Sequence, residues 1–239
     1  MQMRIGRKPN KIQFVCENPD LDYFDKPVPA SKVIPKWYKE TDSYTDKPMR
    51  YTTMGISSTI KKCMPVFDVM SSGYIITLPC DVHVGLDALG LPSFTWTIEY
   101  NLVTDHDLSQ VYLLPFPQEM HTKVFKWSNP WIVRTPKGWS TMFVAPNYSD
   151  DSPFKILPAI VDTDGFELSV QFPFLLRKGF EGVIKAGTPI AQVIPFKRAS
   201  WEASYSTLAT GLSFKNLQKH SRFFSNRYKR TFWNRKDYK

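Results

Sequence analysis

The chain has 239 residues, of which 42% are apolar and 19 are proline. The apolar share is enough for a core, but so many prolines exclude a helical bundle or coiled coil, because a proline inside a helix costs about 3 kcal/mol. The formal charge is +9, the three cysteines are widely spaced and odd in number, and no run of 18 apolar residues occurs, so we expect free thiols, no membrane-spanning helix and no membrane partner.

The N-terminal residues 1–55 are expected to form an extended arm. Residues 17–55 are rich in Pro, Asp, Lys and Tyr, and one short helix is expected over residues 31–40, with Pro35 near its start. A free linker would not carry many large aromatic residues. The aromatic residues that we expect to hold the arm against the body are Tyr23, Phe24, Trp37 and Tyr38.

The central residues 56–206 are expected to form an all-β body, a jelly-roll or β-clip-like sandwich or barrel. Short β-branched and aromatic runs alternate there with Pro, Gly and Asn-Asp breaks, at the spacing typical of such folds. A short helix fits residues 65–71. The expected strands are 58–62, 73–78, 81–84, 94–103, 123–127, 132–134, 140–144, 155–161, 166–172, 182–184 and 190–196.

Alternation and turn residues support these boundaries. Large apolar residues occupy every second position from Phe94 to Tyr100, which predicts a strand with one buried face. Asp164-Gly165 predicts a β-hairpin, and Pro136-Lys137-Gly138 predicts a turn. The segment 186–189 should end one strand before the next begins.

The C-terminal residues 207–239 are expected to form a basic tail. Residues 214–239 contain nine basic residues and one acidic residue, so they hold +8 of the +9 net charge. Spacing predicts an amphipathic helix that either docks on the body or binds an acidic protein or nucleic acid. The expected partner-binding residues are Lys215, Lys219, Arg222, Phe224, Arg227, Tyr228, Lys229, Arg230, Phe232 and Arg235.

Candidate catalytic and metal-binding patterns are weak. Asp81 and His83 share a strand face and could join His121 in a metal site, but the usual His-x-Asp order is reversed, so we expect no metal and no cofactor. The segment 162–165 lacks the later ligands of a calcium loop. Cys63, although next to two lysines, has no nearby histidine in the sequence and is expected to be structural.

Several longer motifs resemble an uncharacterised protein family of T4-like marine and cyanobacterial phages, which has shorter bacterial relatives. The resemblance covers most of residues 30–239, and the motifs that carry it are 62–68, 73–76, 126–140, 159–164 and 186–198. It implies a phage protein made in the reducing cytoplasm of a host cell.

A second resemblance, over residues 135–196, is to the β-core of dUTP pyrophosphatases and dCTP deaminases. The turn 135–138, the segment 159–166 and the segment 187–192 are similar to motifs of that core. This resemblance implies that Asp162 corresponds to the acid that positions water. The phosphate-binding Arg-Ser segment is absent, and Asn147–Asp151, with two adjacent acids, stands in its neighbourhood. We therefore expect the topology to carry over without the catalysis.

Together these features predict a non-enzymatic structural or assembly protein of a phage virion, in the capsid, neck or tail. Its expected partners are other phage structural proteins in an oligomeric assembly, contacted through the arm and the tail, and nucleic acid is a further partner for the tail. The alternative is a nucleotide- or small-molecule-binding enzyme of the dUTP-pyrophosphatase-like β class. A host-takeover or nucleic-acid-binding factor is also left open.

Overall fold

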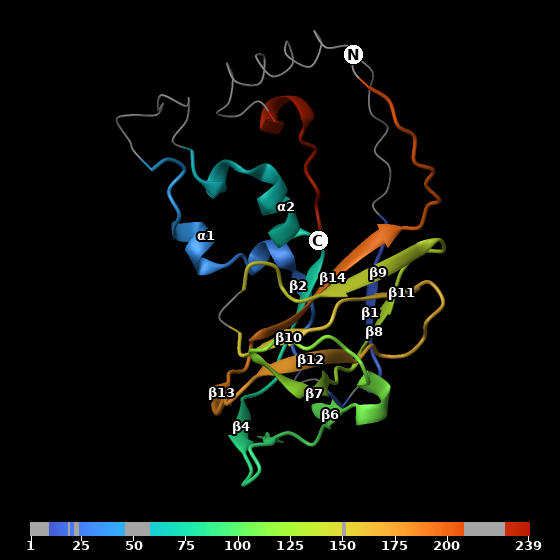
Figure 1. Cartoon of the computed structure of the whole chain (residues 1–239). Helices are drawn as coiled ribbons and strands as arrows, with labels where there is room; N and C mark the ends of the chain where they lie inside the picture. The colour runs from blue at the N-terminus through green and yellow to red at the C-terminus, as the bar shows by residue number, and fades with distance from the viewer. Residues whose placement is uncertain (1–9, 19, 22–23, 46–57, 150–151, 208–227) are drawn as a thin grey trace. The chain divides into compact units, whose positions relative to one another are not determined.

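The computed structural model describes residues 10–18, 20–21, 24–45, 58–149, 152–207 and 228–239 (Figure 1). The chain divides into two compact units. Unit 1 comprises Met1–Val28 and Gly73–Arg198, and unit 2 comprises Pro29–Ser72 and Ala199–Lys239. Unit 2 thus combines residues from the predicted arm, from both ends of the predicted body and from the predicted tail.

The regular secondary structure of unit 1 consists almost entirely of antiparallel β-strands, which confirms the all-β class. A five-stranded sheet has the order β11 (Ala159–Val161), β9 (Trp139–Val144), β14 (Pro189–Lys197), β3 (Tyr74–Thr77), β2 (Val28–Pro29). A four-stranded sheet has the order β10 (Phe154–Ile156), β12 (Phe172–Arg177), β7 (Met120–Trp127), β6 (Val103–Asp105). A three-stranded sheet has the order β13 (Gly182–Ile184), β4 (Val82–Leu86), β5 (Pro92–Thr95).

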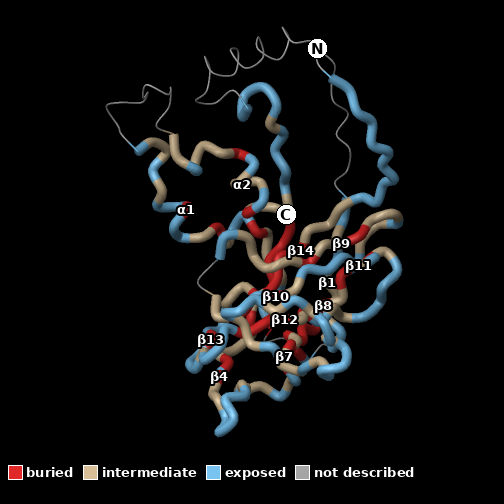
Figure 2. Tube along the Cα trace, viewed as in Figure 1, coloured by how far each residue is buried: buried red, intermediate tan, exposed pale blue. Residues whose placement is uncertain are grey.

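Strand β14 is the centre of the five-stranded sheet. It pairs with β3 on one side and with β9 on the other, and its residues Ile190–Val193 are buried. Figure 2 shows buried residues along β14, β12 and β7. A strand flanked on both edges has its backbone groups paired, so its apolar side chains can be withdrawn from water without leaving unpaired amides.

Aromatic side chains fill the core beside the four-stranded sheet. Trp127 of β7 stacks on Phe174 of β12 with ring centroids 4.4 Å apart and planes 10° apart. Phe94, Phe125 and Phe154 pack around this pair at centroid distances of 5.1–6.4 Å. Such offset and edge-on contacts add to the stabilisation from area burial.

Strand β1 (Gln13–Cys16) forms a separate two-stranded sheet with β8 (Trp131–Arg134). The register runs from Gln13 opposite Arg134 to Cys16 opposite Trp131. β1 therefore belongs to unit 1, although it falls within the predicted arm.

Unit 2 contains short helices around a small apolar core. The 3-10 helix η1 (Ala30–Lys32) and helix α1 (Lys36–Glu40) replace the single expected helix, because Pro35 interrupts it and becomes the N-cap of α1. Helix α2 (Met64–Ser71) confirms the helix expected at 65–71. Ile34, Tyr38 and Met70 form the core, with Val66 and Phe67 packed against it.

Four expected strands differ from the structure. Residues 60–62 form the 3-10 helix η2 (Ile60–Lys62). In the segment 94–103, β5 ends at Thr95 and the next strand, β6, begins only at Val103. The segment 155–161 splits into β10 and β11, in different sheets, since Pro158 cannot donate to a ladder. The strand expected at 166–172 begins only at Phe172.

The turns are mostly as expected. Pro136–Gly138 and the segment 186–189 are turns, with positive φ at Gly138 and Gly187. Asp162–Gly165 is a turn but not a β-hairpin, because β11 pairs with β9 and not with the segment that follows. Unit 1 also has the 3-10 helix η3 (Leu108–Val111), which Asp107 caps at its N-terminus.

The described part of the tail is not an α-helix. Tyr228–Phe232 form one π-helical turn, η4, and the residues after it have no regular structure. Lys215, Lys219, Arg222, Phe224 and Arg227 of the expected amphipathic helix lie outside the described residues. Within the part of the chain that the structure describes, no helix is both long and apolar enough to cross a membrane.

Candidate functional site

Asp162, the candidate water-positioning acid, lies directly after β11 in unit 1. Its Oδ1 accepts a hydrogen bond of 2.6 Å from Oγ of Ser140 on β9 and lies 3.1 Å from Nη1 of Arg198. The Asp162 side chain is 70% exposed, so solvent reaches the carboxylate. The carboxylate therefore has two protein partners that orient it, a hydroxyl and a guanidinium group.

Asp164 is held more firmly than Asp162. Nη1 and Nη2 of Arg198 donate to its two oxygens at 2.9 and 2.5 Å, and the Gly138 amide donates to Oδ2 at 2.8 Å. These hydrogen bonds, that from Arg198 above all, lower the pKa of Asp164 to about 2, and the same pairing raises the pKa of Arg198. The contacts join the turn 136–138, the turn 162–165 and the residue after β14.

A chain of threonine hydroxyls continues this network inward. Oγ1 of Thr163 lies 2.8 Å from Oγ1 of both Thr135 and Thr141, and the Thr163 amide donates to the carbonyl of Val161. Thr141 and Thr163 are buried. These contacts fix the position of the Asp162 turn, which is the arrangement expected of a structural corner.

The segment that begins at Asn147 occupies the part of the sequence where the phosphate-binding motif would be expected, and it is held by Gln192 of β14. Oε1 of this buried residue accepts from Nδ2 and the amide of Asn147, at 2.7 and 3.2 Å. A cavity of about 490 Å³ adjoins the segment and is lined mainly by apolar and neutral side chains, with Lys155 as a charged member. Asp150 and Asp151 lie outside the described residues.

The metal-ligand candidates have other roles. Asp81 accepts from Nζ of Lys185 and from the Ala186 amide, each at 2.8 Å, and these bonds lower its pKa. His83 is exposed on β4, and Nδ1 of His121 accepts from the Lys123 amide. Among the described residues, no group of three or more His, Cys, Asp or Glu is placed to hold a metal ion. The three cysteines are free thiols, as expected, and the structure places them half-buried.

In unit 2, the end of the tail packs on helix α2 through Asp68. Nε1 of Trp233 lies 3.0 Å from both carboxylate oxygens, and Nζ of Lys236 lies 2.5 Å from Oδ2. The Asp68 side chain is only 15% exposed. One acid on α2 thus anchors two residues of the tail, which agrees with a tail docked on the protein.

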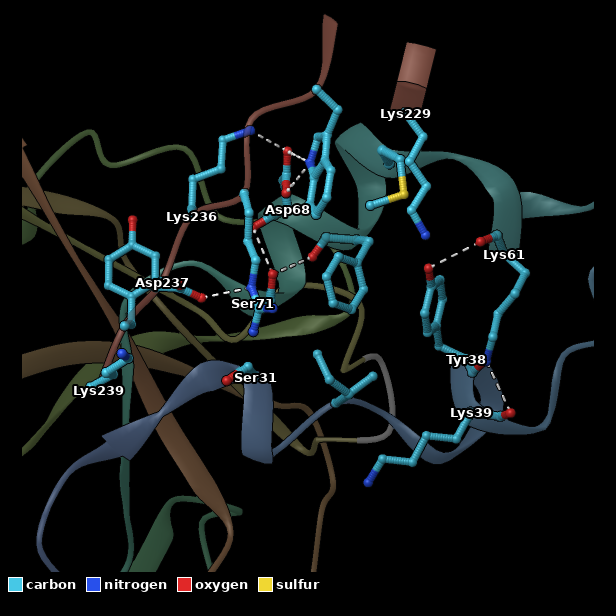
Figure 3. A pocket seen from close by; sticks show the side chains of 16 residues that line it. Ser31, Tyr38, Lys39, Lys61, Asp68, Ser71, Lys229, Lys236, Asp237 and Lys239 are labelled. Atoms are coloured by element: carbon cyan, nitrogen blue, oxygen red, sulfur yellow. Dashed lines mark hydrogen bonds and ion pairs between the residues drawn. The ribbon is translucent and has the colours of Figure 1, made fainter. Parts of the chain in front are cut away.

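These contacts border a pocket of about 730 Å³ (Figure 3). Ionic side chains dominate its polar lining, with six basic and two acidic residues. Figure 3 shows Tyr38, Lys61 and Lys229 on one side of the view, and Asp237 and Lys239 on the other. The basic residues are Lys39, Lys61, Lys229, Arg235, Lys236 and Lys239, and the acidic ones are Asp68 and Asp237.

The pocket includes two of the predicted partner-binding residues, Lys229 and Arg235. Tyr228, Arg230 and Phe232 are exposed and do not line it. Sequence reasoning missed its remaining lining, above all Trp233 and the residues from η1 to α2. The available signal was weak: a single acid, Asp68, in a short predicted helix and a tail rich in bases and aromatic residues.

Large apolar side chains are also displayed to solvent. Trp201 and Tyr205, in the irregular segment after Arg198, are 92% and 94% exposed. In unit 1, the loop around η3 exposes Leu108, Tyr112 and Leu113. Single exposed apolar residues are ordinary, but grouped ones mark interaction surfaces.

No model of a known protein family matches the chain, and no curated protein matches it either.

Proposed function

We propose that this chain is a non-enzymatic assembly protein that binds neighbouring protein subunits through exposed aromatic side chains. The observation that carries the proposal is the near-complete exposure of Trp201 and Tyr205, four residues apart in a segment without regular structure. Aromatic residues are enriched at protein interfaces, and an irregular segment can lie across a neighbour's surface. The apolar loop around η3 supplies a second contact of the same kind.

The assembly is proposed to be a phage virion, with other phage structural proteins as partners. The resemblance of five sequence motifs to a phage family supports this setting, as does the all-β class of unit 1. We also propose that the strands of unit 1 have a jelly-roll or β-clip-like topology. The alternative enzyme of the dUTP-pyrophosphatase-like class is favoured by one observation, the solvent-exposed carboxylate of Asp162 beside Ser140.

The direct test is mass spectrometry of purified particles of the phage that encodes the chain. We expect the protein in the particles at a fixed copy number. We expect the double variant Trp201→Ser/Tyr205→Ser to be lost from the particles while its circular dichroism spectrum is unchanged. Leu89→Ser is the matched control, because Leu89 is 83% exposed in a different loop, and it should be incorporated normally. Particles that lack the wild-type protein would overturn the proposal.

A further inference from the structure

The unit 2 pocket has a large excess of positive charge. Its two acids already have partners. Asp68 accepts a hydrogen bond from Lys236, and Oδ1 of Asp237 lies 2.7 Å from Nε of Arg235. Six basic and two acidic lining residues leave an excess of four positive charges. Like charges gathered in a concave site repel one another, so this excess favours an anionic ligand. We propose that the pocket binds a nucleotide, with its base against the aromatic wall and its phosphates among the lysines.

Three aromatic side chains line this part of the pocket, of which the half-buried Phe67 and Trp233 are accessible to a base. Tyr38 is buried and stacks on Phe67, with centroids 6.2 Å apart and planes at 29°. Trp233 is half-buried and has Nζ of Lys229 and of Lys236 at 6.0 and 5.9 Å from its ring. Burial raises the pKa of Tyr38 from a value already well above neutral pH, so its phenol carries no charge that would repel phosphate. Such rings stack on bases without requiring one particular base.

The lysines lie next to these rings. Nζ of Lys61 is 4.6 Å from the Tyr38 ring centroid and donates to the carbonyl oxygens of Tyr38 and Lys39. Nζ of Lys229 is directed toward the same part of the pocket (Figure 3). Lysine binds phosphate as a point charge, and a terminal phosphate carries about −1.5 to −2 at neutral pH. Ammonium groups bordering aromatic faces therefore match a ligand that has both a ring and several negative charges.

Size and charge favour a nucleotide over an acidic peptide. The volume of about 730 Å³ is within the range of small-molecule sites, about 300–1,000 Å³. Each carboxylate of a peptide carries one charge, so an acidic peptide would have to place several residues in the pocket to match the four excess charges, whereas a nucleoside polyphosphate carries several charges at one place. The base and phosphate can come from a free nucleotide or from a nucleic acid strand. Binding either does not require the assembly role proposed above.

The test is isothermal titration calorimetry of the full chain at physiological salt, with ATP as the first probe. We expect saturable binding of ATP, and at least tenfold weaker binding of inorganic triphosphate and of adenosine, because each lacks one half of the ligand. Lys229→Gln should weaken ATP binding about three- to fivefold, the upper part of the range of one solvent-exposed ionic contact. Arg230→Gln removes the same charge from the next residue, which does not line the pocket, and should change the affinity less than twofold.

The remaining measurements show whether the ligand is a free nucleotide or a nucleic acid strand, and they can overturn the proposal. A short oligothymidylate that binds more than tenfold tighter than ATP, and is weakened by Lys229→Gln, would identify a strand as the source; comparable or weaker binding would identify a free nucleotide. The proposal is wrong if ATP does not bind at millimolar concentration, or if inorganic triphosphate binds as well as ATP. It is also wrong if both substitutions weaken binding equally. A polyglutamate peptide that binds as tightly as ATP would instead indicate an acidic protein partner.

Discussion

Gly73 lies so close to the carbonyl oxygen of Val193 that a Cβ atom at residue 73 would be 2.0 Å from that oxygen. Gly73 also has φ of +72°, in the left-handed region that disfavours other residues. It stands just before β3, and Val193 is buried in the central strand β14. The approach of these two backbones thus depends on the absence of a side chain.

Gly73→Ala is expected to destabilise unit 1 by about 2–5 kcal/mol, because the conformational strain adds to a steric clash. Gly90→Ala is the matched control. Gly90 has nearly the same φ, +73°, but nothing lies within 4 Å of the added Cβ, so strain alone should cost about 1–2 kcal/mol. Urea denaturation followed by circular dichroism measures both. Equal losses would show that the contact with Val193 does not matter.

The Arg198–Asp164 pair predicts a stability change at low pH. The pKa of Asp164 is about 2 in the folded protein and about 3.9 in an unfolded chain. A lowered carboxyl pKa stabilises the fold above the unfolded value, and this stabilisation is lost as pH falls toward 2. Asp164→Asn should therefore lose part of the stability gained between pH 2 and pH 4, measured by thermal unfolding at each pH. Asp162→Asn should keep it, since Arg198 still meets Asp164.

Removal of the Asp68 carboxylate should loosen the end of the tail without unfolding unit 1. Asp68→Ala leaves the Trp233 indole and the Lys236 ammonium without this partner, at a cost of about 1–3 kcal/mol. Hydrogen exchange should accelerate in α2 and in residues 228–239, while the strands of unit 1 keep their protection. Asp42→Ala, at an exposed acid of unit 2, should leave the hydrogen-exchange rates of α2 and of residues 228–239 unchanged. Uniform acceleration over the whole chain would contradict this prediction.

The purified protein is expected not to hydrolyse dUTP or dCTP, with or without Mg²⁺. The Arg-Ser phosphate segment is missing from the sequence, and Asp162 is tied to Ser140 and Arg198. Release of pyrophosphate or ammonia measures both reactions. Steady turnover that Asp162→Asn abolishes would favour the enzyme over the assembly protein.

Local sequence patterns predicted many strands but few of their partners. Runs of β-branched and aromatic residues located β3, β9 and β14 to within about one residue. Alternation from Phe94 to Tyr100 correctly indicated one half-buried face. It did not reveal that ladder pairing stops at Thr95, because alternation reports burial and not hydrogen bonding.

The unit 2 pocket could not be predicted for a related reason. Its anchor joins Trp233 to Asp68, 165 positions apart in the chain. No local period or motif encodes such a pairing. The tail's charge was visible in the sequence, but charge alone predicts that a partner is acidic and not which acid of the same chain it meets.

Because each of the two units is built from segments far apart in the chain, some of their contacts can form only late in synthesis. Strand β1 leaves the ribosome early but has no partner until β8 follows, more than 100 residues later. The same holds in unit 2, where Asp68 of α2 is synthesised long before its partners Trp233 and Lys236. The backbone groups of β1 and the Asp68 carboxylate therefore lack these partners on the nascent chain for much of translation. Slow elongation lengthens the time in which such groups can meet the wrong neighbour, so this connectivity exposes the nascent chain to mispairing for longer than a sequential arrangement would.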